Sequence, residues 1–153
     1  MSEREIVVAQ KGHIRDAAFD VRQQVFCQEQ GLFDGSDLDA HDEGAIHLAA
    51  LADGLVVGTV RLYEREPGVW IGGRLAVLRG HRGGTGFRLV QRAVEEARRR
   101  GASVFLASVQ SPNEPFFRRL GWHTVAEGQE LRGMPHVIME APLWVRSQRR
   151  MGS

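Results

Sequence analysis

Apolar residues along the chain recur in places at every second position, as in strands, and in places at every third or fourth position, as in helices. Residues 5–10 (EIVVAQ) predict a first strand, and residues 14–30 predict a first helix with one buried stripe. The stripe consists of Ile14, Ala18, Val21 and Val25. Glycines and clustered acids over 31–45 then predict a solvated loop, because such a composition cannot bury itself.

The next segments predict a hairpin and a further strand. Residues 46–66 form the hairpin, since the Asp-Gly pair at 53–54 is a favoured two-residue turn between apolar runs. The Pro-Gly turn at 67–68 leads into a fourth strand that ends at Val77. Inside this strand Gly72-Gly73 lacks side chains to pack, which suggests a bulge or a close backbone approach.

The second half of the chain predicts two more helices and three strands. A helix with an apolar face ends at Gly101, and arginines 98–100 suit its negative end. The face consists of Phe87, Val90, Val94 and Ala97. The remaining predictions are a fully buried central strand over 103–109, a short helix over 112–121 with Asn113 as cap and Pro115 in its first turn, and strands over 122–127 and 136–144 joined by the turn-rich residues 128–135. The pattern therefore predicts a mixed α/β sheet covered by helices.

Composition narrows the class of protein. The 153 residues, 42% of them hydrophobic and 25% charged, predict a single domain over 1–145 and a polar, mobile tail over 146–153. The lone Cys27 allows neither an intramolecular disulfide nor a cysteine zinc cluster. The first ten residues carry acids and no long apolar run, so we expect neither a signal peptide nor a membrane span, and we expect a cytoplasmic protein.

Charge is distributed unevenly along the chain. Residues 1–53 hold 11 acids and 4 bases, whereas residues 54–153 hold 8 acids and 16 bases. Nearly all bases are arginines, which suit phosphate, although codon bias explains this equally well. The arginines are dispersed, without a recognition helix or aromatic platform, so nucleic acid is not an expected partner. The acids over 34–43 do not follow the spacing of a calcium loop, and no metal site is predicted.

A glycine-rich loop at 82–87 (RGGTGF) is the clearest candidate for chemistry. Gly83, Gly84 and Gly86 can expose backbone N–H groups, and the start of the following helix adds its own unpaired N–H groups and positive dipole end. Such a corner attracts a phosphate or diphosphate. The loop matches neither the Walker pattern nor the dinucleotide fingerprint. An ordinary strand-to-helix turn remains an equally good interpretation of the composition.

Five fragments in order resemble the GCN5-related N-acetyltransferases (GNAT), and within them the ElaA-type branch. The fragments are VRQQVFCQEQ, DLDAHD, GRLAV, FFRRLGW and GMPHVIM. The resemblance implies a mixed, mostly antiparallel sheet of six or seven strands, with helices on both faces and a splay between the fourth and fifth strands. It also implies an acyl-CoA-dependent N-acyltransferase, with acetyl-CoA as the expected donor and a small-molecule amine as acceptor.

The resemblance further implies a set of site residues. The coenzyme-binding residues would be Leu75, Ala76, Val77, Arg82, Gly83, Gly84, Thr85, Gly86, Phe87, Gln110 and Phe117. Gln30, Asp39 and Asp42 would lie on the acceptor side, where the acids could attract a cationic amine. Glu29 and His136 are the catalytic candidates, against the alternatives of a solvated helix-end acid and a hydrogen-bonded strand-end histidine.

Two departures from the family pattern keep other functions open. The loop from Arg82 to Gly86 is one residue shorter than the family's, and Phe117 occupies the position of the tyrosine that often protonates the leaving thiolate. A catalytically silent domain that binds acyl-CoA as a sensor or interaction module is therefore the chief alternative, and a structural protein that binds no CoA is a third. Whether the final strands pair across a homodimer stays open.

Overall fold

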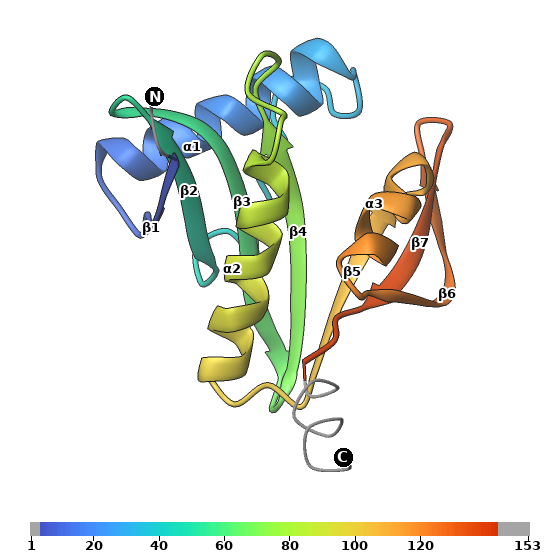
Figure 1. Cartoon of the computed structure of the whole chain (residues 1–153). Coiled ribbons are helices and arrows are strands. Elements are labelled where there is room, and N and C mark those ends of the chain that lie inside the picture. The colour runs from blue at the N-terminus through green and yellow to red at the C-terminus, as the bar shows by residue number, and fades with distance from the viewer. Residues whose placement is uncertain (1–3, 144–153) are drawn as a thin grey trace. The chain divides into compact units, whose positions relative to one another are not determined.

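The computed structural model describes residues 4–143, so the predicted tail over 146–153 lies outside the described residues. Figure 1 shows the strands and helices of the chain. Their bounds are β1 Arg4–Val8, α1 His13–Arg22, the π-helix η1 Gln23–Glu29, β2 Ile46–Ala52, β3 Leu55–Glu66, β4 Val69–Val77, α2 Thr85–Arg99, β5 Val104–Gln110, the 3₁₀-helix η2 Ser111–Asn113, α3 Glu114–Arg119, β6 His123–Leu131 and β7 Met134–Glu140. The strand order is β1-β2-β3-β4-β5-β7-β6.

The chain forms two compact units. The first comprises residues up to 63 together with 73–93, and the second comprises 64–72 together with the residues from 94 onward. The first unit therefore holds β1, β2, most of β3 and the C-terminal half of β4. The second holds the start of β4 with β5, β6 and β7. The prediction of a single domain over 1–145 stays a prediction.

In the first unit, helices cover both faces of the sheet. Phe19 of α1 meets the His47 ring edge-on at 5.1 Å, and His47 lies opposite Arg61 in the β2–β3 ladder. Gly58 lies an odd number of residues from Arg61 and so faces the other way, where a Cβ on it would lie 3.1 Å from Leu89 of α2. α1 and α2 thus pack on opposite faces, and α2 crosses in front of β3 and β4 in Figure 1.

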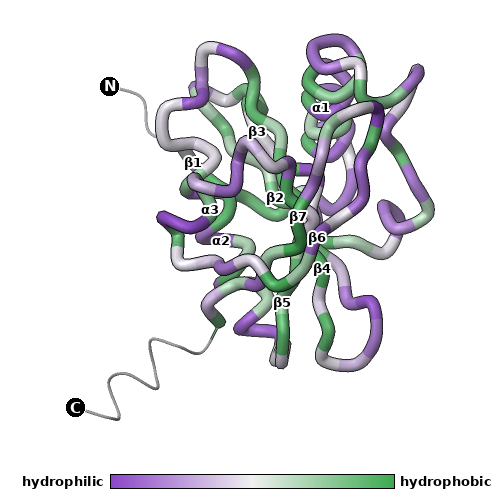
Figure 2. The backbone as a smooth tube through the Cα atoms, turned by 90° about the vertical axis from the view of Figure 1, so that its right-hand side faces the viewer, coloured by the Kyte–Doolittle hydropathy of each residue, from purple (hydrophilic) through white to green (hydrophobic). Residues whose placement is uncertain are grey.

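In the second unit, the β4–β5 pair is parallel and the pairs β5–β7 and β6–β7 are antiparallel. The parallel register runs from Val69–Val104 to Gly72–Ala107 and stops there, although β4 continues to Val77. With the antiparallel pairs of β2 to β1 and β3, this confirms the predicted fold class. Apolar and hydrophilic segments follow one another along the backbone in Figure 2.

Two predicted turns are tight, but one differs from its predicted length. Asp53 and Gly54 adopt φ of 53° and 82°, as the Asp-Gly hairpin requires. Arg132 and Gly133 adopt φ of 50° and 80°, so β6 and β7 continue to a two-residue turn in place of the predicted turn region 128–135. Gly can adopt positive φ without strain, which explains a turn there despite the unfavourable Arg132.

The predicted first helix is correct in extent but not in type. Its last seven residues form a π-helix, in which the Gln30 amide donates to the Val25 carbonyl at 2.9 Å. A single apolar stripe fits either helix type, so the pattern could not reveal the change. Ala18, Val21 and Val25 are buried as predicted, while Ile14 is half-buried.

The apolar face of α2 was predicted with one wrong member. Thr85 and Leu89 are fully buried and define the face toward the sheet, with Ala93 and Ala97 on the same stripe. Phe87 is 41% exposed, because a residue two positions from Thr85 lies about 200° around the helix. Val90 and Val94 are buried, as predicted.

Two details of the segment after α2 also differ from the prediction. β5 is not fully buried: Phe105, Ala107 and Val109 are buried, whereas Ser108 is exposed, because only one face of the strand is fully covered. Asn113 precedes α3 but makes no side-chain capping bond. Pro115 does lie in the first turn, as predicted.

Candidate functional site

The glycine loop leads directly into α2, as the sequence predicts. Gly84 has a φ of 92°, a conformation that favours glycine. The Arg88 amide donates to the Gly84 carbonyl at 3.1 Å. The amides of Thr85, Gly86 and Phe87 precede this helical hydrogen bond and belong to the first turn, whose amides have no partner within the helix. A Cβ on Gly83 would meet no other heavy atom of the described chain within 4 Å, so the loop surface is open at that point.

The first turn of α2 packs tightly on β3. A Cβ on Gly58 would lie 3.1 Å from Leu89 Cδ1, 3.2 Å from Thr85 Cγ2 and 3.3 Å from the Ala76 carbonyl. Thr85 is fully buried, and its hydroxyl has no hydrogen-bond partner within residues 4–143. Glycine at position 58 therefore lets the first turn of α2 approach the sheet closely, and this close packing holds the glycine loop in place.

Arg82 connects three parts of the first unit. Its Nε donates to the Val77 carbonyl at 2.8 Å, and its Nη2 donates to the Glu29 carboxylate at 2.8 Å. Arg79 approaches the second oxygen of Glu29 at 3.3 Å. The hydrogen bond from Arg82, together with the charges of both arginines, holds the pKa of Glu29 below its usual range. The end of η1, the end of β4 and the glycine loop are thus joined by the guanidinium of Arg82.

The C-terminal half of β4 lies beyond the parallel ladder with β5. Ala76 and Val77 are buried and Leu75 is half-buried, so the side chains of this edge belong largely to the core. Ala76 packs with Val21, Val25 and Phe26 from the first helix. Just before these residues, Arg74 has a φ of 54°, which is rare for a side chain other than glycine. The irregularity expected at Gly72-Gly73 thus includes a left-handed residue at Arg74.

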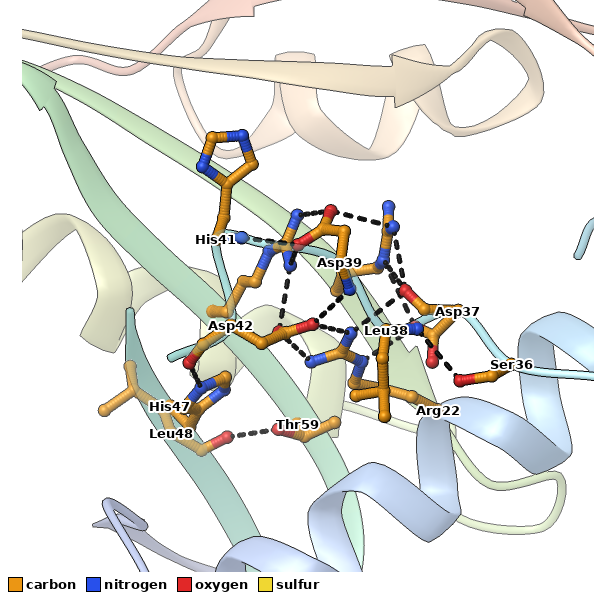
Figure 3. A network of polar contacts seen from close by, with 12 residues as sticks. Arg22, Ser36, Asp37, Leu38, Asp39, His41, Asp42, His47, Leu48 and Thr59 are labelled. Atoms are coloured by element: carbon orange, nitrogen blue, oxygen red, sulfur yellow. Dashed lines mark hydrogen bonds and ion pairs between the residues drawn. The ribbon is translucent and has the colours of Figure 1, made fainter. Parts of the chain in front are cut away.

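A largely buried cluster of three arginines and three aspartates ties the acidic loop to the sheet (Figure 3). Arg22 is 1% exposed, and its Nε donates to Asp37 at 2.7 Å. Its two terminal nitrogens donate to both oxygens of Asp42, at 2.7 and 3.0 Å. This two-pronged geometry fixes the direction as well as the distance of the pair.

Arg61 and Arg74 complete the cluster. The terminal nitrogens of Arg61 donate to the two oxygens of Asp39 at 2.7 and 2.8 Å, and one of them also donates to Asp42 at 2.9 Å. Arg74 contacts a carboxylate oxygen of Asp37 and one of Asp39, each at 3.2 Å. Three positive and three negative charges therefore balance within one group of side chains.

The prediction of a solvated acidic loop is wrong for its central residues. Asp37 is 2% exposed and Asp42 is buried, because each is neutralised by arginines from other elements. Burial by itself would raise the pKa of Asp42, but hydrogen bonds from Arg22, the Asp39 amide and Arg61 lower it well below the usual range. The one available signal was Arg22, a charge within the helix next to the buried stripe.

The remaining site candidates lie elsewhere in the chain. In the second unit, Gln110 is opposite His136 in the β5–β7 ladder, and the His136 ring donates from Nδ1 to the Met134 carbonyl at 2.9 Å. Phe117 is buried, edge-on to Phe116 and to Trp122, with ring centroids 5.3 Å apart in both pairs. In the first unit, the exposed Gln30 follows Glu29, the last residue of η1.

The described residues contain neither a candidate metal site nor a candidate membrane-spanning helix. Over residues 4–143, no three histidine, cysteine, aspartate or glutamate side chains are grouped so that they could hold a metal ion. Within the same residues, no helix has the length and apolar composition needed to span a bilayer.

The family model of the acetyltransferase (GNAT) family matches residues 13–122. The chain therefore belongs to the GNAT family, which confirms the predicted membership. An uncharacterized N-acetyltransferase of Bacillus subtilis, YjcF, is 27% identical over 136 residues, which cover 88% of this chain and 96% of the relative.

Solved structures share the fold over nearly the whole chain. An acyl-CoA N-acyltransferase from Pseudomonas aeruginosa is 25% identical with a TM-score of 0.78, covering 92% of this chain and 99% of its own. ElaA of Escherichia coli is 20% identical with a TM-score of 0.77 and the same coverage. The yncA protein of Salmonella typhimurium, solved with acetyl-CoA, is 21% identical with a TM-score of 0.72, covering 93% and 95%. The last two likenesses concern the fold alone.

Proposed function

We propose that the chain is an acyl-CoA-dependent N-acyltransferase that transfers the acyl group, acetyl in the first instance, directly to an amine of a small molecule. The observation that carries this proposal is the open glycine loop at the start of α2, placed directly after β4 in a member of the GNAT family. The acetyl-CoA in the structure of the Salmonella protein supports acetyl-CoA as the donor.

The donor would be held mainly by the backbone. The loop amides of Gly83, Thr85, Gly86 and Phe87 would donate to the diphosphate, with the positive end of α2 behind them. The Gly84 amide instead donates to the Arg82 carbonyl at 3.1 Å. The main chain of Leu75, Ala76 and Val77 would pair with the pantetheine arm, as an extended ligand pairs with the edge of a sheet. Gln110 and Phe117 join the donor site on the strength of the family resemblance alone.

Arg82, the first residue of the loop, would do more than bind a diphosphate. Arg82 already donates to the Val77 carbonyl and to Glu29, so its guanidinium is partly engaged before any ligand arrives. In this proposal the backbone amides bind the diphosphate, Arg82 orders the loop, and its charge strengthens the attraction for an anion. A loop one residue shorter than the family's pattern is compatible with these roles, because it still presents its backbone amides.

The reaction requires a neutral amine whose lone pair attacks the thioester carbonyl. The C–N bond forms, the C–S bond breaks, and the amine proton passes to a base while the thiolate leaves. His136 is the better candidate base, since a neutral ring that donates from Nδ1 keeps a lone pair on Nε2. Glu29 has a lowered pKa, which makes it the weaker base, and its carboxylate would attract the protonated amine before the proton is removed. A thiol of ordinary pKa, about 8.5, can leave without the usual tyrosine.

The acceptor is proposed to be a small amine that approaches the acidic loop and the end of η1. Gln30 is exposed there, and the Asp39 side chain is about one third exposed. Arginines bind both oxygens of Asp39 and both oxygens of Asp42. Because Asp42 is also buried, we assign it the task of shaping the loop rather than binding the amine. A cytoplasmic location and a homodimer remain predictions.

A catalytically silent acyl-CoA sensor is the second candidate function. It is favoured by Phe117, which is packed among aromatic rings and cannot donate a proton. Thiol release from acetyl-CoA, measured over a panel of small amines, separates the two functions. Turnover that falls in His136→Ala supports the enzyme, whereas tight binding of acetyl-CoA without turnover on any amine supports the sensor.

Substitution at the loop tests the donor site itself. Gly83→Glu adds a carboxylate where space is open and should weaken acetyl-CoA binding at least about tenfold, because it repels the diphosphate. Gly44→Glu is the matched control, since Gly44 is also exposed, has open space and does not need a positive φ. At a concentration a hundred times its Kd, acetyl-CoA should add about 2.7 kcal/mol to the unfolding free energy of the wild type. Unchanged stability with acetyl-CoA would contradict the proposal.

A further inference from the structure

Arg74 has a backbone conformation that its residue type disfavours. Its φ is 54°, and the other described non-glycine residues with positive φ, Asp53 and Arg132, lie in hairpin turns. Arg74 lies instead inside β4, directly before the edge Leu75–Val77. A side chain with a Cβ loses about 1–2 kcal/mol in this conformation, which glycine adopts freely. An arginine at this position therefore implies a use for its side chain.

The side chain is held from several directions by the acidic loop. Its Nη2 donates to the Asp37 carbonyl at 3.0 Å, and its Nε lies 3.2 Å from an Asp37 carboxylate oxygen. Nη2 also donates to Asp39 at 3.2 Å, and the guanidinium carbon lies 4.6 Å from the centre of the Phe33 ring. Asp37 is in turn fixed to the first helix by Arg22. The anchor of Arg74 is thus built into the core of the first unit.

The same surroundings also disfavour the positive charge of Arg74. Burial and the neighbouring positive charges of Arg61 and Arg22 lower the pKa of Arg74. A guanidinium in this position would move toward water if its partners were absent. The contacts with Asp37 and Asp39 must therefore outweigh both the repulsion and the backbone strain.

We propose that Arg74 is a positioning residue: the acidic loop holds its side chain, which keeps the backbone left-handed and so sets the direction of the edge Leu75–Val77. This inference rests on the proposed function for the use of that edge, which is to pair with the pantetheine arm. The acidic loop, predicted as the acceptor side, and the donor edge are then parts of one rigid assembly. A change in the loop at Asp39 reaches the donor through Arg74.

Two substitutions at position 74 separate the effect of the left-handed backbone from the effect of the lost side-chain contacts. Arg74→Ala and Arg74→Gly remove the same ion pairs, but only the glycine variant tolerates the left-handed backbone. If the side chain is needed to hold the strain, the alanine variant should lose the geometry of the edge and the glycine variant should keep it. A role in stability alone would affect the two variants alike.

The experiment measures hydrogen exchange at the amides of Leu75, Ala76 and Val77 in the ligand-free chains, together with the Kd for acetyl-CoA. For Arg74→Ala we expect exchange and Kd to increase about five- to thirtyfold over wild type, the equivalent of the left-handed penalty. For Arg74→Gly we expect values within about threefold of wild type. Equal changes in the two variants would overturn the inference.

Asp39→Asn provides a second test that does not depend on the alanine variant folding. In the wild-type background the substitution should speed exchange at the edge, because one anchor of Arg74 is weakened. In the R74G background it should have little effect on exchange. The same effect in both backgrounds would overturn the inference. If the exchange results hold but no chain, wild type included, binds acetyl-CoA, the proposed function fails and the positioning of the edge stands.

Discussion

The carboxylate of Glu29 accepts a hydrogen bond of 2.8 Å from Arg82, the arginine that heads the glycine loop. Arg79 reaches the other carboxylate oxygen at 3.3 Å. Arg79 and Arg82, the two arginines that precede the proposed diphosphate site, are therefore already paired with an anion from the protein itself. A bound diphosphate would have to share these arginines with Glu29.

Removing this competitor should strengthen donor binding. Glu29→Gln keeps a hydrogen-bond acceptor for Arg82 but loses the charge, so we expect acetyl-CoA to bind about two- to fivefold more tightly at low salt, as suits a partly exposed pair. Turnover should fall if Glu29 also binds the amine. Calorimetric Kd and initial rates give the two quantities separately. Glu95→Gln, at an exposed helix position, is the control of equal charge, and weaker binding in E29Q would refute the competition.

Gly58 should be intolerant of even one methyl group. In Gly58→Ala the new Cβ would lie 3.1 to 3.3 Å from Leu89, Thr85 and the Ala76 carbonyl, so the start of α2 must move away from β3. We expect a loss of about 1–3 kcal/mol of unfolding free energy, as in other overpacked sites. Urea unfolding measures the loss. Gly83→Ala serves as control, because its Cβ enters open space, and an equal loss in both variants would contradict the packing argument.

The local features of this fold could be predicted from the sequence, because neighbouring residues determine them. The turn at Asp53-Gly54 follows from two residues, and the start of α2 after Gly84 follows from the loop and the apolar stripe. The family resemblance extended these features to a sheet with a parting between β4 and β5. Two of the site residues that the resemblance implies, Gln110 and His136, lie opposite each other in the sheet.

The buried ion cluster could not be predicted in the same way. Arg22 bonds to Asp37 fifteen positions away and Arg74 bonds to the same residue thirty-seven positions away. Hydrophobic periodicity treats all charges as solvent-facing, so it assigns a cluster of acids to a solvated loop. The left-handed backbone at Arg74 has the same origin, since its side-chain partners rather than its neighbours in sequence hold it there. Both features arise from the fold as a whole.

Loss of a single carboxylate from the ion cluster should be costly for stability. Asp42→Asn leaves Arg22 and Arg61 with less negative charge in a buried site, and we expect a loss of about 3–5 kcal/mol of unfolding free energy. Asp53→Asn is the control, because Asp53 is exposed and asparagine suits its left-handed turn. Denaturant unfolding near neutral pH provides the comparison. A loss below about 1 kcal/mol in D42N would mean that the cluster contributes no more than a surface pair.

His47 should make the folded chain sensitive to mild acid. Its Nε2 lies 2.8 Å from the Asp42 carbonyl, an acceptor, so Nε2 carries the proton of the neutral ring. Nδ1 is buried and has no hydrogen-bond partner in the described part of the chain. A second proton would leave a buried N–H without an acceptor, close to the charges of Arg22 and Arg61. Burial lowers the pKa of His47 below its ordinary value of 6.5. The Asp42 carbonyl and carboxylate oppose this shift, and the charges of Arg22 and Arg61 add to it.

The sign of the pH effect follows from this lowered pKa. Just below pH 6.5 the unfolded chain binds a proton at His47 that the folded chain does not, so the contribution to stability is full above that pH and is lost as pH falls. We expect the urea midpoint of the wild type to drop between about pH 7 and about pH 5, and His47→Gln to remove that part of the drop. His41→Gln, at an exposed ring stacked on Tyr63, should keep the wild-type slope. A slope unchanged in H47Q would show that His47 accepts its second proton in the folded state without loss.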